Sequence, residues 1–493
     1  MENIFKFIKD NSLLHGQKCF IKSNEGEWTY SRVYRKACAI SAHLADAGVK
    51  KGDRVILFCG NSVQYAEGFF GILAANAIAV PVNPVKLAEN VRYIAEKCSP
   101  VLVLYCGATA DRAAKIYGGS GIKSLNIDEI PYTEDNIDAA CTEEPQDHYG
   151  GDYDDAALLL FTSGTTSRPK GVTLSHGNLL ANTLAINEYL GLESDDSILM
   201  TLPFSYSYGN SILLTHAMAG ATIIIENSTA YPSLILEAIK KHKVSGFSTV
   251  GSYIHLMINY ARGLSEPVRF FESLKYITFA GESTDYSDIS YLTENYPELK
   301  VYVMYGQTEA SARLSYLNPD LLHVRKGSIG KGLINVELRV VNKAGDEVKS
   351  GEIGEIIARG PSIMKGYWED PDATVQVIRD GWLHTGDSAT VDEDGYIYVR
   401  GRMTDMIKFM GHRISPLEVE NVINRNPFVK ESAVVESVQN GIPCIKAVLV
   451  LEEGKSLTDE VRQSINMALP TYMRPQIYEE ARALPRTDNG KIK

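Results

Sequence analysis

Residues 160–171 read Leu-Phe-Thr-Ser-Gly-Thr-Thr-Ser-Arg-Pro-Lys-Gly, and no other segment of this chain is as informative. The apolar run 156–161 leads into it and predicts a buried strand. The loop that follows is rich in hydroxyl groups and glycine, and Lys170 is its cation. Because glycine lets backbone N–H groups approach an anion, such a loop suits a polyphosphate. It is not the loop of the P-loop NTPases, since Pro169 precedes the lysine and Gly171 follows it.

This string resembles the phosphate-binding loop of the ANL superfamily of adenylate-forming enzymes, which includes acyl-CoA synthetases, adenylation domains of peptide synthetases and beetle luciferases. The usual loop of that superfamily reads T-S-G-T-T-G-x-P-K-G, and Ser167 replaces the third glycine here. The resemblance extends over nearly the whole chain. It implies that ATP phosphates are held by the loop residues Thr162, Ser163, Gly164, Thr165, Thr166 and Lys170.

The bulk composition excludes several other classes of protein. A chain of 493 residues predicts more than one domain, and its net charge of −12 argues against a nucleic-acid partner. The seven cysteines are scattered without a C-x-x-C pair, which disfavours a zinc site or a disulfide framework. The most apolar stretch, residues 69–82, is too short to cross a bilayer. With no apolar signal region at the start, we expect a cytoplasmic protein without a transmembrane segment.

Alternating patterns predict the architecture. Residues 54–58 and 101–105 read as buried strands and residues 30–47 as a helix, which is typical of a parallel sheet covered on both faces. Glycine turns and short β segments between residues 330 and 400 predict a small barrel-like β unit. In the tail, Ser415 to Glu418 form a capping box that begins a helix.

We therefore predict an α/β fold with two domains. The large N-terminal domain, residues 1–403, has two parallel-type sheets with helices and the small β-barrel-like unit. A small, mobile α+β C-terminal domain covers residues 404–493, and Thr404 stands at the hinge that the resemblance implies.

Two further motifs resemble nucleotide-binding segments of the superfamily. Residues 304–309 read Met-Tyr-Gly-Gln-Thr-Glu after an apolar strand and look like its Y-G-x-T-E motif. Tyr305 can stack on adenine, Thr308 offers a hydroxyl to phosphate, and Glu309 is an oxygen ligand that suits Mg²⁺. The resemblance also places Gly306, and the turn with Gly281 and Glu282 beside adenine, at the nucleotide.

The ribose and thiol sites are implied by motifs nearer the C-terminus. His384 to Asp387 resemble the T-G-D motif, and a carboxylate such as Asp387 can accept two hydrogen bonds from a ribose diol. Arg402 matches the second ribose-side residue. Gly411 and Arg413 match residues along the path of a pantetheine thiol and near phosphate or CoA. Residues 484–491 resemble P-R-T-x-x-G-K, so Lys491 matches the lysine of the adenylation step.

The acyl pocket lies, by resemblance, around residues 202–210. Tyr206 matches a residue beside the substrate carboxylate, and Ser207 stands where amino-acid-activating members carry an aspartate. Because a buried ammonium needs a counter-charge, the missing acid argues against an α-amino acid. Small and polar residues leave room for a medium-sized acyl or aryl carboxylate, and the predicted pocket residues are Tyr206, Ser207, Asn210, Gly251 and Ala280.

The implied activity is a two-step ligation that uses ATP, Mg²⁺ and CoA. A carboxylic acid, fatty or aryl, is adenylated with release of pyrophosphate, and a thiol then attacks the acyl adenylate. The first hypothesis is a carboxylate–CoA ligase. Three alternatives stay open: loading of the phosphopantetheine arm of a separate carrier protein, a luciferase-like oxidation, and a non-catalytic adenylate-binding regulator. Glu309 and Lys491 together argue against the last one.

Overall fold

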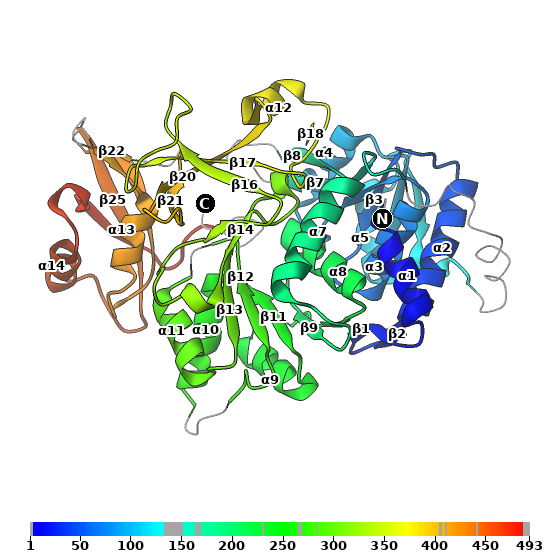
Figure 1. Cartoon of the computed structure of the whole chain (residues 1–493), viewed down its shortest axis with the longest axis horizontal. Helices are drawn as coiled ribbons and strands as arrows, with labels where there is room; N and C mark the ends of the chain where they lie inside the picture. The colour runs from blue at the N-terminus through cyan, green and yellow to red at the C-terminus, as the bar shows by residue number, and fades with distance from the viewer. Residues whose placement is uncertain are drawn as a thin grey trace. The chain divides into compact units, whose positions relative to one another are not determined.

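The computed structural model of the chain shows two compact units (Figure 1). One comprises Met1–Leu338 with Ala358–Leu383, and the other comprises Arg339–Ile357 with His384–Lys493. This division differs from the predicted one, since residues 339–357 and 384–403 belong to the second unit. The boundary at 403/404 concerned domain movement and stays a prediction. The structure describes residues 3–132, 151–162, 169–228, 231–264, 269–282, 284–403, 407–409, 412–439 and 442–486.

A seven-stranded sheet in the first unit has the order β18-β8-β7-β4-β3-β5-β6. The five strands from β7 to β6 in this order pair in parallel. At the other edge, β8 pairs antiparallel with β7, and β18 pairs antiparallel with β8. Only seven residues join β7 to β8, and a parallel connection would need a dozen or more. The strands are β3 (Arg54–Phe58), β4 (Ile78–Pro81), β5 (Leu102–Tyr105), β6 (Lys123–Asn126), β7 (Ala156–Thr162), β8 (Lys170–Ser175) and β18 (Gly366–Tyr367).

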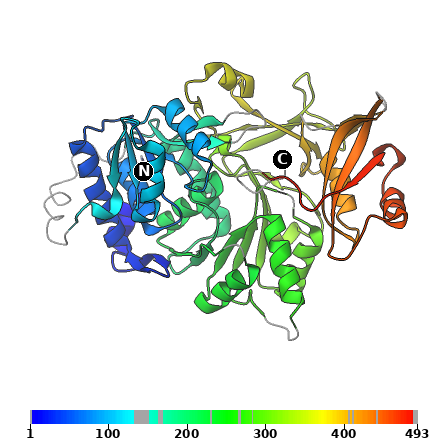
Figure 2. The same cartoon turned by 180° about the vertical axis from the view of Figure 1, so that it is seen from behind.

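Helices cover both faces of this sheet (Figures 1 and 2). Val55 and Leu57 of β3 pack in one apolar cluster with the helices α2 and α3. Ile56 and Phe58 point to the opposite face, where they pack with α4 and α5. Burial on both faces explains the continuous apolar runs in the sequence. The helices are α2 (Tyr30–Asp46), α3 (Val63–Ala74), α4 (Ala88–Cys98) and α5 (Ala110–Tyr117).

A nine-stranded sheet in the same unit has the order β15-β14-β13-β12-β11-β9-β10-β1-β2. Its centre from β13 to β1 is parallel, and β2, β14 and β15 are antiparallel. Figure 1 shows α10 and α11 beside β12 and β13, and Figure 2 shows the same group from behind. The strands are β1 (Cys19–Ser23), β2 (Gly26–Thr29), β9 (Ser197–Met200), β10 (Thr222–Ile225), β11 (Gly246–Thr249), β12 (Tyr276–Phe279), β13 (Lys300–Tyr305), β14 (Ser315–Leu317) and β15 (Lys331–Gly332).

Local signals in the sequence set the ends of α7 (His176–Leu190). Ser175 and Asn178 form a reciprocal capping box at its start, and Gly191 ends it with φ +61. The other helices of this unit are α1 (Lys6–Leu14), α8 (Ser207–Ala219), α9 (Pro232–His242), α10 (Gly251–Arg262), α11 (Tyr286–Asn295) and α12 (Pro371–Val377).

The second unit is a small α+β body with its own apolar core. The serine half of the predicted capping box is present, since Ser415 Oγ accepts a hydrogen bond from Glu418 N at 3.2 Å. The fold class predicted from the sequence is confirmed. The remaining strands and α-helices of the described residues are β16 (Glu337–Val341), β17 (Gly354–Arg359), β19 (Ile378–Arg379), β20 (Trp382–Val391), β21 (Ile397–Arg402), β22 (Ile407–Phe409), β23 (His412–Ile414), α13 (Pro416–Ile423), β24 (Val429–Gln439), β25 (Ile442–Leu451), α14 (Asp459–Ala468) and β26 (Ile477–Glu480).

Candidate active site

The two ends of the predicted phosphate loop are held side by side. Thr162 ends β7, Lys170 begins β8, and the two residues are opposite each other in the antiparallel pair. The two residues that border the predicted phosphate loop are therefore held next to each other by the strand pair. Ser163, Gly164, Thr165 and Thr166, which were predicted to bind phosphate, lie outside the described residues.

Tyr367 connects this loop to the predicted magnesium ligand. Its hydroxyl donates a hydrogen bond to Glu309 Oε1 at 2.8 Å, and Lys170 Nζ lies 4.9 Å from the centre of its ring. The ammonium over the ring face is a favourable cation–π contact. Tyr367 reaches this place because β18 pairs with β8, with Tyr367 opposite Val172. Sequence reasoning missed Tyr367, since no motif surrounds it.

Glu309 suits a Mg²⁺ ion that is bound by one protein carboxylate together with the phosphates of a nucleotide. Its backbone oxygen accepts a hydrogen bond from Met364 N at 2.8 Å, which fixes the turn η3 (Thr308–Ala310). In the described part of the chain, no group of three or more His, Cys, Asp or Glu residues could hold a metal by itself. Mg²⁺ usually takes one or two carboxylates and completes its shell with phosphate and water. A single carboxylate beside a phosphate loop matches that pattern.

The start of α8 brings a predicted acyl-pocket residue to the Y-G-Q-T-E motif. Ser207 Oγ lies 3.3 Å from Thr308 Oγ1, so the two hydroxyls are hydrogen-bonded. Gly306 has a steric reason to be glycine, because a Cβ there would lie 1.9 Å from the carbonyl oxygen of Ala312. Tyr305 packs at the border of an apolar cluster. The predicted pocket residue Ser207 therefore lies directly beside Thr308 of the motif.

Neighbouring parallel strands bring Gly251 and Ala280 to one edge of the nine-stranded sheet. Thr249 of β11 is paired with Phe279 of β12, so the residues that follow both strands lie next to each other. Gly281 has φ +92, a backbone conformation that favours glycine. Glu282 Oε1 accepts a hydrogen bond from Ser252 N at the start of α10. The predicted adenine turn and the predicted acyl pocket therefore share this edge.

Tyr206 directly precedes α8, and Asn210 is a buried residue of its first turn. Lys86 Nζ lies 5.6 Å from the centre of the Tyr206 ring. Asn210 N donates to Tyr206 O at 2.8 Å, and the Asn210 side chain is 2% exposed. Its side-chain amide lies within hydrogen-bonding reach of the Tyr65 hydroxyl in α3.

The two predicted ribose residues are neighbours in the second unit. Asp387 of β20 is opposite Arg402 of β21, and Arg402 Nε lies 3.1 Å from Asp387 Oδ1. Arg402 also donates to Thr385 O at 2.9 Å. Glu355, which sequence reasoning missed, fixes the turn by accepting from Gly386 N at 3.1 Å and by pairing with His384 Nδ1 at 2.8 Å. The carboxylate of Asp387 is thereby held by a preformed frame.

Two family models match the chain. One, described as an AMP-binding enzyme, covers residues 10–368, and the other, described as an AMP-binding enzyme C-terminal domain, covers residues 418–491. This chain belongs to the AMP-binding enzymes. They form the adenylate-forming superfamily that the motifs resemble.

Individual relatives match nearly all or all of this AMP-binding enzyme. The feruloyl-CoA synthase of an Amycolatopsis species is 32% identical over 475 residues, which cover 94% of this chain and 92% of the relative. The 2-succinylbenzoate–CoA ligase of Bacillus cereus is 27% identical and covers 100% of this chain and 97% of its own. The structure of ATP-bound MatB from Rhodopseudomonas palustris superposes with a TM-score of 0.86 at 25% identity, over 100% of this chain and 97% of that one.

Some predicted residues of this AMP-binding enzyme remain without a structural description. Thr404, Gly411 and Lys491 lie outside the described residues, and only the backbone of Arg413 is described, in β23. None of the helices in the described ranges combines the length and the apolarity that a bilayer crossing requires.

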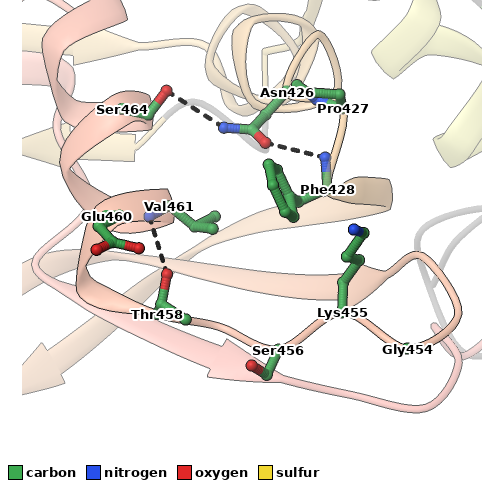
Figure 3. A pocket seen from close by; sticks show the side chains of 10 residues that line it. All are labelled: Asn426, Pro427, Phe428, Gly454, Lys455, Ser456, Thr458, Glu460, Val461 and Ser464. Carbon is green, nitrogen blue, oxygen red and sulfur yellow. Dashed lines mark hydrogen bonds between the residues drawn. The ribbon is translucent and has the colours of Figure 1, made fainter.

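A cavity of about 320 Å³ in the second unit does not belong to the candidate site (Figure 3). It opens between the segment that precedes β24, residues 426–428, and the loop before α14, where Lys455 lies over the ring of Phe428. None of the predicted site residues that the structure describes lines it. The motifs, and not this cavity, therefore define the candidate active site.

Proposed function

We propose that this chain is an AMP-forming carboxylate–CoA ligase, which adenylates a carboxylic acid with ATP and then transfers the acyl group to the thiol of CoA. The observation that carries the proposal is the contact chain from Lys170 through Tyr367 to Glu309. It joins a phosphate-binding cation to an oxygen ligand suited to Mg²⁺. Relatives named as acid–CoA ligases support the same reaction class.

In the adenylation step, a substrate carboxylate oxygen attacks the α-phosphorus of ATP, and pyrophosphate leaves. The chain lowers the barrier by neutralising charge and aligning the reactants. Lys170 and the loop hydroxyls hold the β and γ phosphates, and Thr308 offers its hydroxyl to phosphate. Mg²⁺ at Glu309 supplies further positive charge when it is bound. Lys491 approaches the carboxylate and the α-phosphate oxygens.

A second set of residues binds the adenine and ribose of the nucleotide. Tyr305 stacks on adenine, Gly281 and Glu282 border it, and Asp387 with Arg402 binds the ribose diol. A carboxylate held by an arginine keeps its negative charge and accepts hydrogen bonds well. Tyr206 lies beside the substrate carboxylate.

In the second step, the thiol attacks the carbonyl carbon of the acyl adenylate, the acyl–phosphate bond breaks, and AMP leaves. The segment with Gly411 and Arg413 guides the pantetheine arm after movement about Thr404. CoA is the acceptor that the relatives' names favour. The acid itself is an acyl or aryl carboxylate, and the relatives are named for acids of quite different shape.

The proposal is tested by a panel of aliphatic and aryl acids with ATP and Mg²⁺, scored for pyrophosphate release and for thioester. Each acid is tested without an acceptor, with CoA and with a purified carrier protein. Thioester with CoA is expected. Transfer only to the carrier would favour the alternative acceptor, and oxygen uptake with light emission would favour the luciferase-like alternative. Absence of pyrophosphate release with every acid would overturn adenylation.

A variant pair separates the two half-reactions. Lys491→Ala is expected to lose pyrophosphate release and still form thioester from a supplied acyl adenylate and CoA. Lys493→Ala is the matched control in the same tail and should behave as the wild type. Equal behaviour of the two variants would remove Lys491 from the adenylation step.

A further inference from the structure

Arg313 is a buried cation that the mechanism above does not use. It lies between the turn η3 and β14, and its residue is only 4% exposed. Its backbone is held on both sides by Asn182, whose Oδ1 accepts from Arg313 N at 3.3 Å and whose Nδ2 donates to Arg313 O at 2.8 Å. The position of this side chain is therefore built into the fold.

Among the described residues, the groups that contact the guanidinium are neutral. Its Cζ lies 3.9 Å from the centre of the Tyr208 ring, and its Nε donates to Met304 Sδ at 3.2 Å. The Tyr189 hydroxyl also faces it, and burial raises the pKa of Tyr189 although the nearby Arg313 opposes that rise. Within the described ranges, no carboxylate forms an ion pair with Arg313.

This arrangement is unfavourable unless an anion completes it. Arginine stays protonated at every physiological pH, so burial cannot neutralise it. A planar guanidinium carries five N–H donors, and an aromatic face with one thioether and one hydroxyl satisfies few of them. A buried charge without a countercharge is costly, and natural chains keep one only where a ligand or partner supplies the opposite charge.

The guanidinium lies at the boundary of the predicted acyl pocket. Tyr208, on which it stacks, follows Ser207, whose Oγ is 3.3 Å from Thr308 Oγ1. A Cβ on Gly306 would lie 2.9 Å from Arg313 Cα, so the arginine backbone runs directly against the Y-G-Q-T-E motif. The far side of Tyr208 is polar too, since its hydroxyl is 2.7 Å from Thr278 Oγ1.

We propose that Arg313 selects the substrate, by pairing with a second negatively charged group on the carboxylic acid. The substrate class is then a dicarboxylic acid, of which one carboxylate is adenylated and the other is bound by Arg313. A carboxylate suits the fork of the guanidinium, because it accepts two parallel hydrogen bonds. This inference rests on the proposed ligase function and deepens it.

The wild-type test compares matched pairs of acids in the pyrophosphate assay, with the full chain, ATP and Mg²⁺. Each dicarboxylic acid, aliphatic or aryl, is paired with its monomethyl ester and with the monocarboxylic acid of equal length. For the best pair, kcat/KM for the diacid is expected to exceed that of both partners at least roughly tenfold, as for sites built around a polar group. Activity with monoacids at equal or higher kcat/KM would overturn the inference and leave the ligase function intact. Activity with no acid at all would overturn the ligase function itself.

Variants then assign the preference to Arg313. Arg313→Gln is expected to lower kcat/KM for the diacid by roughly tenfold or more while the monoacid changes little, and Arg313→Lys to retain part of the preference. Arg92→Gln, an exposed arginine of α4, is the control and should change neither. The KM for ATP of the Arg313 variants should stay within about twofold of the wild-type value, because Arg313 is proposed to contact the acid and not ATP.

Stability provides a second readout. Arg313→Met removes an uncompensated buried charge, so its Tm should equal or exceed that of the wild type in the absence of acid. Added diacid should raise the Tm of the wild type and not that of Arg313→Met. If the Arg313 variants show a clear fall in Tm together with equal losses of kcat/KM for diacid and monoacid, Arg313 is a structural residue. If they show a raised KM for ATP, Arg313 binds phosphate. Either result overturns the inference.

Discussion

Tyr367 donates a hydrogen bond to Glu309 at 2.8 Å while its ring carries the ammonium of Lys170 at 4.9 Å. One side chain thus orients a carboxylate and a cation that are expected to act on the same phosphates. The hydroxyl and the ring have separable roles, because the hydrogen bond needs only the oxygen and the cation–π contact needs only the ring.

Tyr367→Phe tests the hydroxyl alone. Loss of a hydrogen bond to a charged group costs about 1.5–3 kcal/mol, so kcat/KM for ATP should fall roughly tenfold to a hundredfold. The Mg²⁺ concentration for half-maximal activity should rise, because Glu309 loses its orienting partner. Pyrophosphate release over a series of Mg²⁺ concentrations measures both effects. Tyr260→Phe, at an exposed position of α10, is the control, and indistinguishable Mg²⁺ curves for the two variants would refute the role of Tyr367.

Asp387→Asn tests the preformed ribose frame. The amide keeps the shape of the side chain but loses the charge that pairs with Arg402 and accepts from a diol, so the KM for ATP should rise roughly tenfold. Tm should change little, since Arg402 is partly exposed and such pairs contribute only about 0–1 kcal/mol to stability. A double-mutant cycle with Arg402→Gln should show non-additive KM effects. Additive effects would mean that the two residues act independently.

Glu67 should give the free energy of unfolding a specific pH dependence. Burial raises the pKa of Glu67 from 4.5 to about 7, and Lys36 and Arg32 oppose the rise while Asp128 adds to it. The folded state therefore binds this proton more tightly than the unfolded state does. The contribution of Glu67 to stability is full below pH 4.5 and is lost as pH rises through about 7.

The corresponding measurement compares the wild type with Glu67→Gln by urea unfolding between pH 4.5 and 8. Buried His176 and His216, whose pKa values burial lowers to about 4, act in the opposite direction and are common to both proteins. As pH rises across this range, the free energy of unfolding of the wild type should therefore fall relative to that of Glu67→Gln. The expected change in the difference between the two proteins is about 2–3 kcal/mol. A constant difference would show that Glu67 titrates normally.

Gly209→Ala should destabilise the first unit through a backbone clash. A Cβ at this position would lie 2.1 Å from the carbonyl oxygen of Pro203, which cannot move away as the tip of a side chain could. We expect a loss of about 1–3 kcal/mol and a lower Tm in thermal unfolding. Gly60→Ala is the control, because its Cβ would meet nothing within 4 Å. Equal Tm values for the two variants would contradict the close approach.

Much of the fold could be predicted from the sequence, because its signals are local. The strand Arg54–Phe58 has the bounds that its apolar run predicts, and α2 begins at Tyr30 as expected. Ser175 and Gly191 set the ends of α7 through capping contacts between residues a few positions apart. In the candidate site, the pairing of Thr162 with Lys170 follows from the short connection between two strands.

Contacts between distant residues depended on the tertiary structure. Tyr367 is 58 residues from Glu309, and it arrives there only because β18 joins the edge of the sheet next to β8. In the sequence, Arg313 belongs to no recognised motif. The structure shows that it is buried and stacked on Tyr208 of α8, and that no carboxylate of the described residues pairs with it.

By itself, the sequence determined the strands, the helix ends and the motifs of an adenylate-forming enzyme, because periodicity, capping and loop chemistry act over a few residues. Only the tertiary structure decided which side chain bonds to Glu309 and which cation lies beside the predicted acyl pocket. Those contacts are made across sheet edges and between packed elements, and the free energy of such packing is not encoded in any short segment.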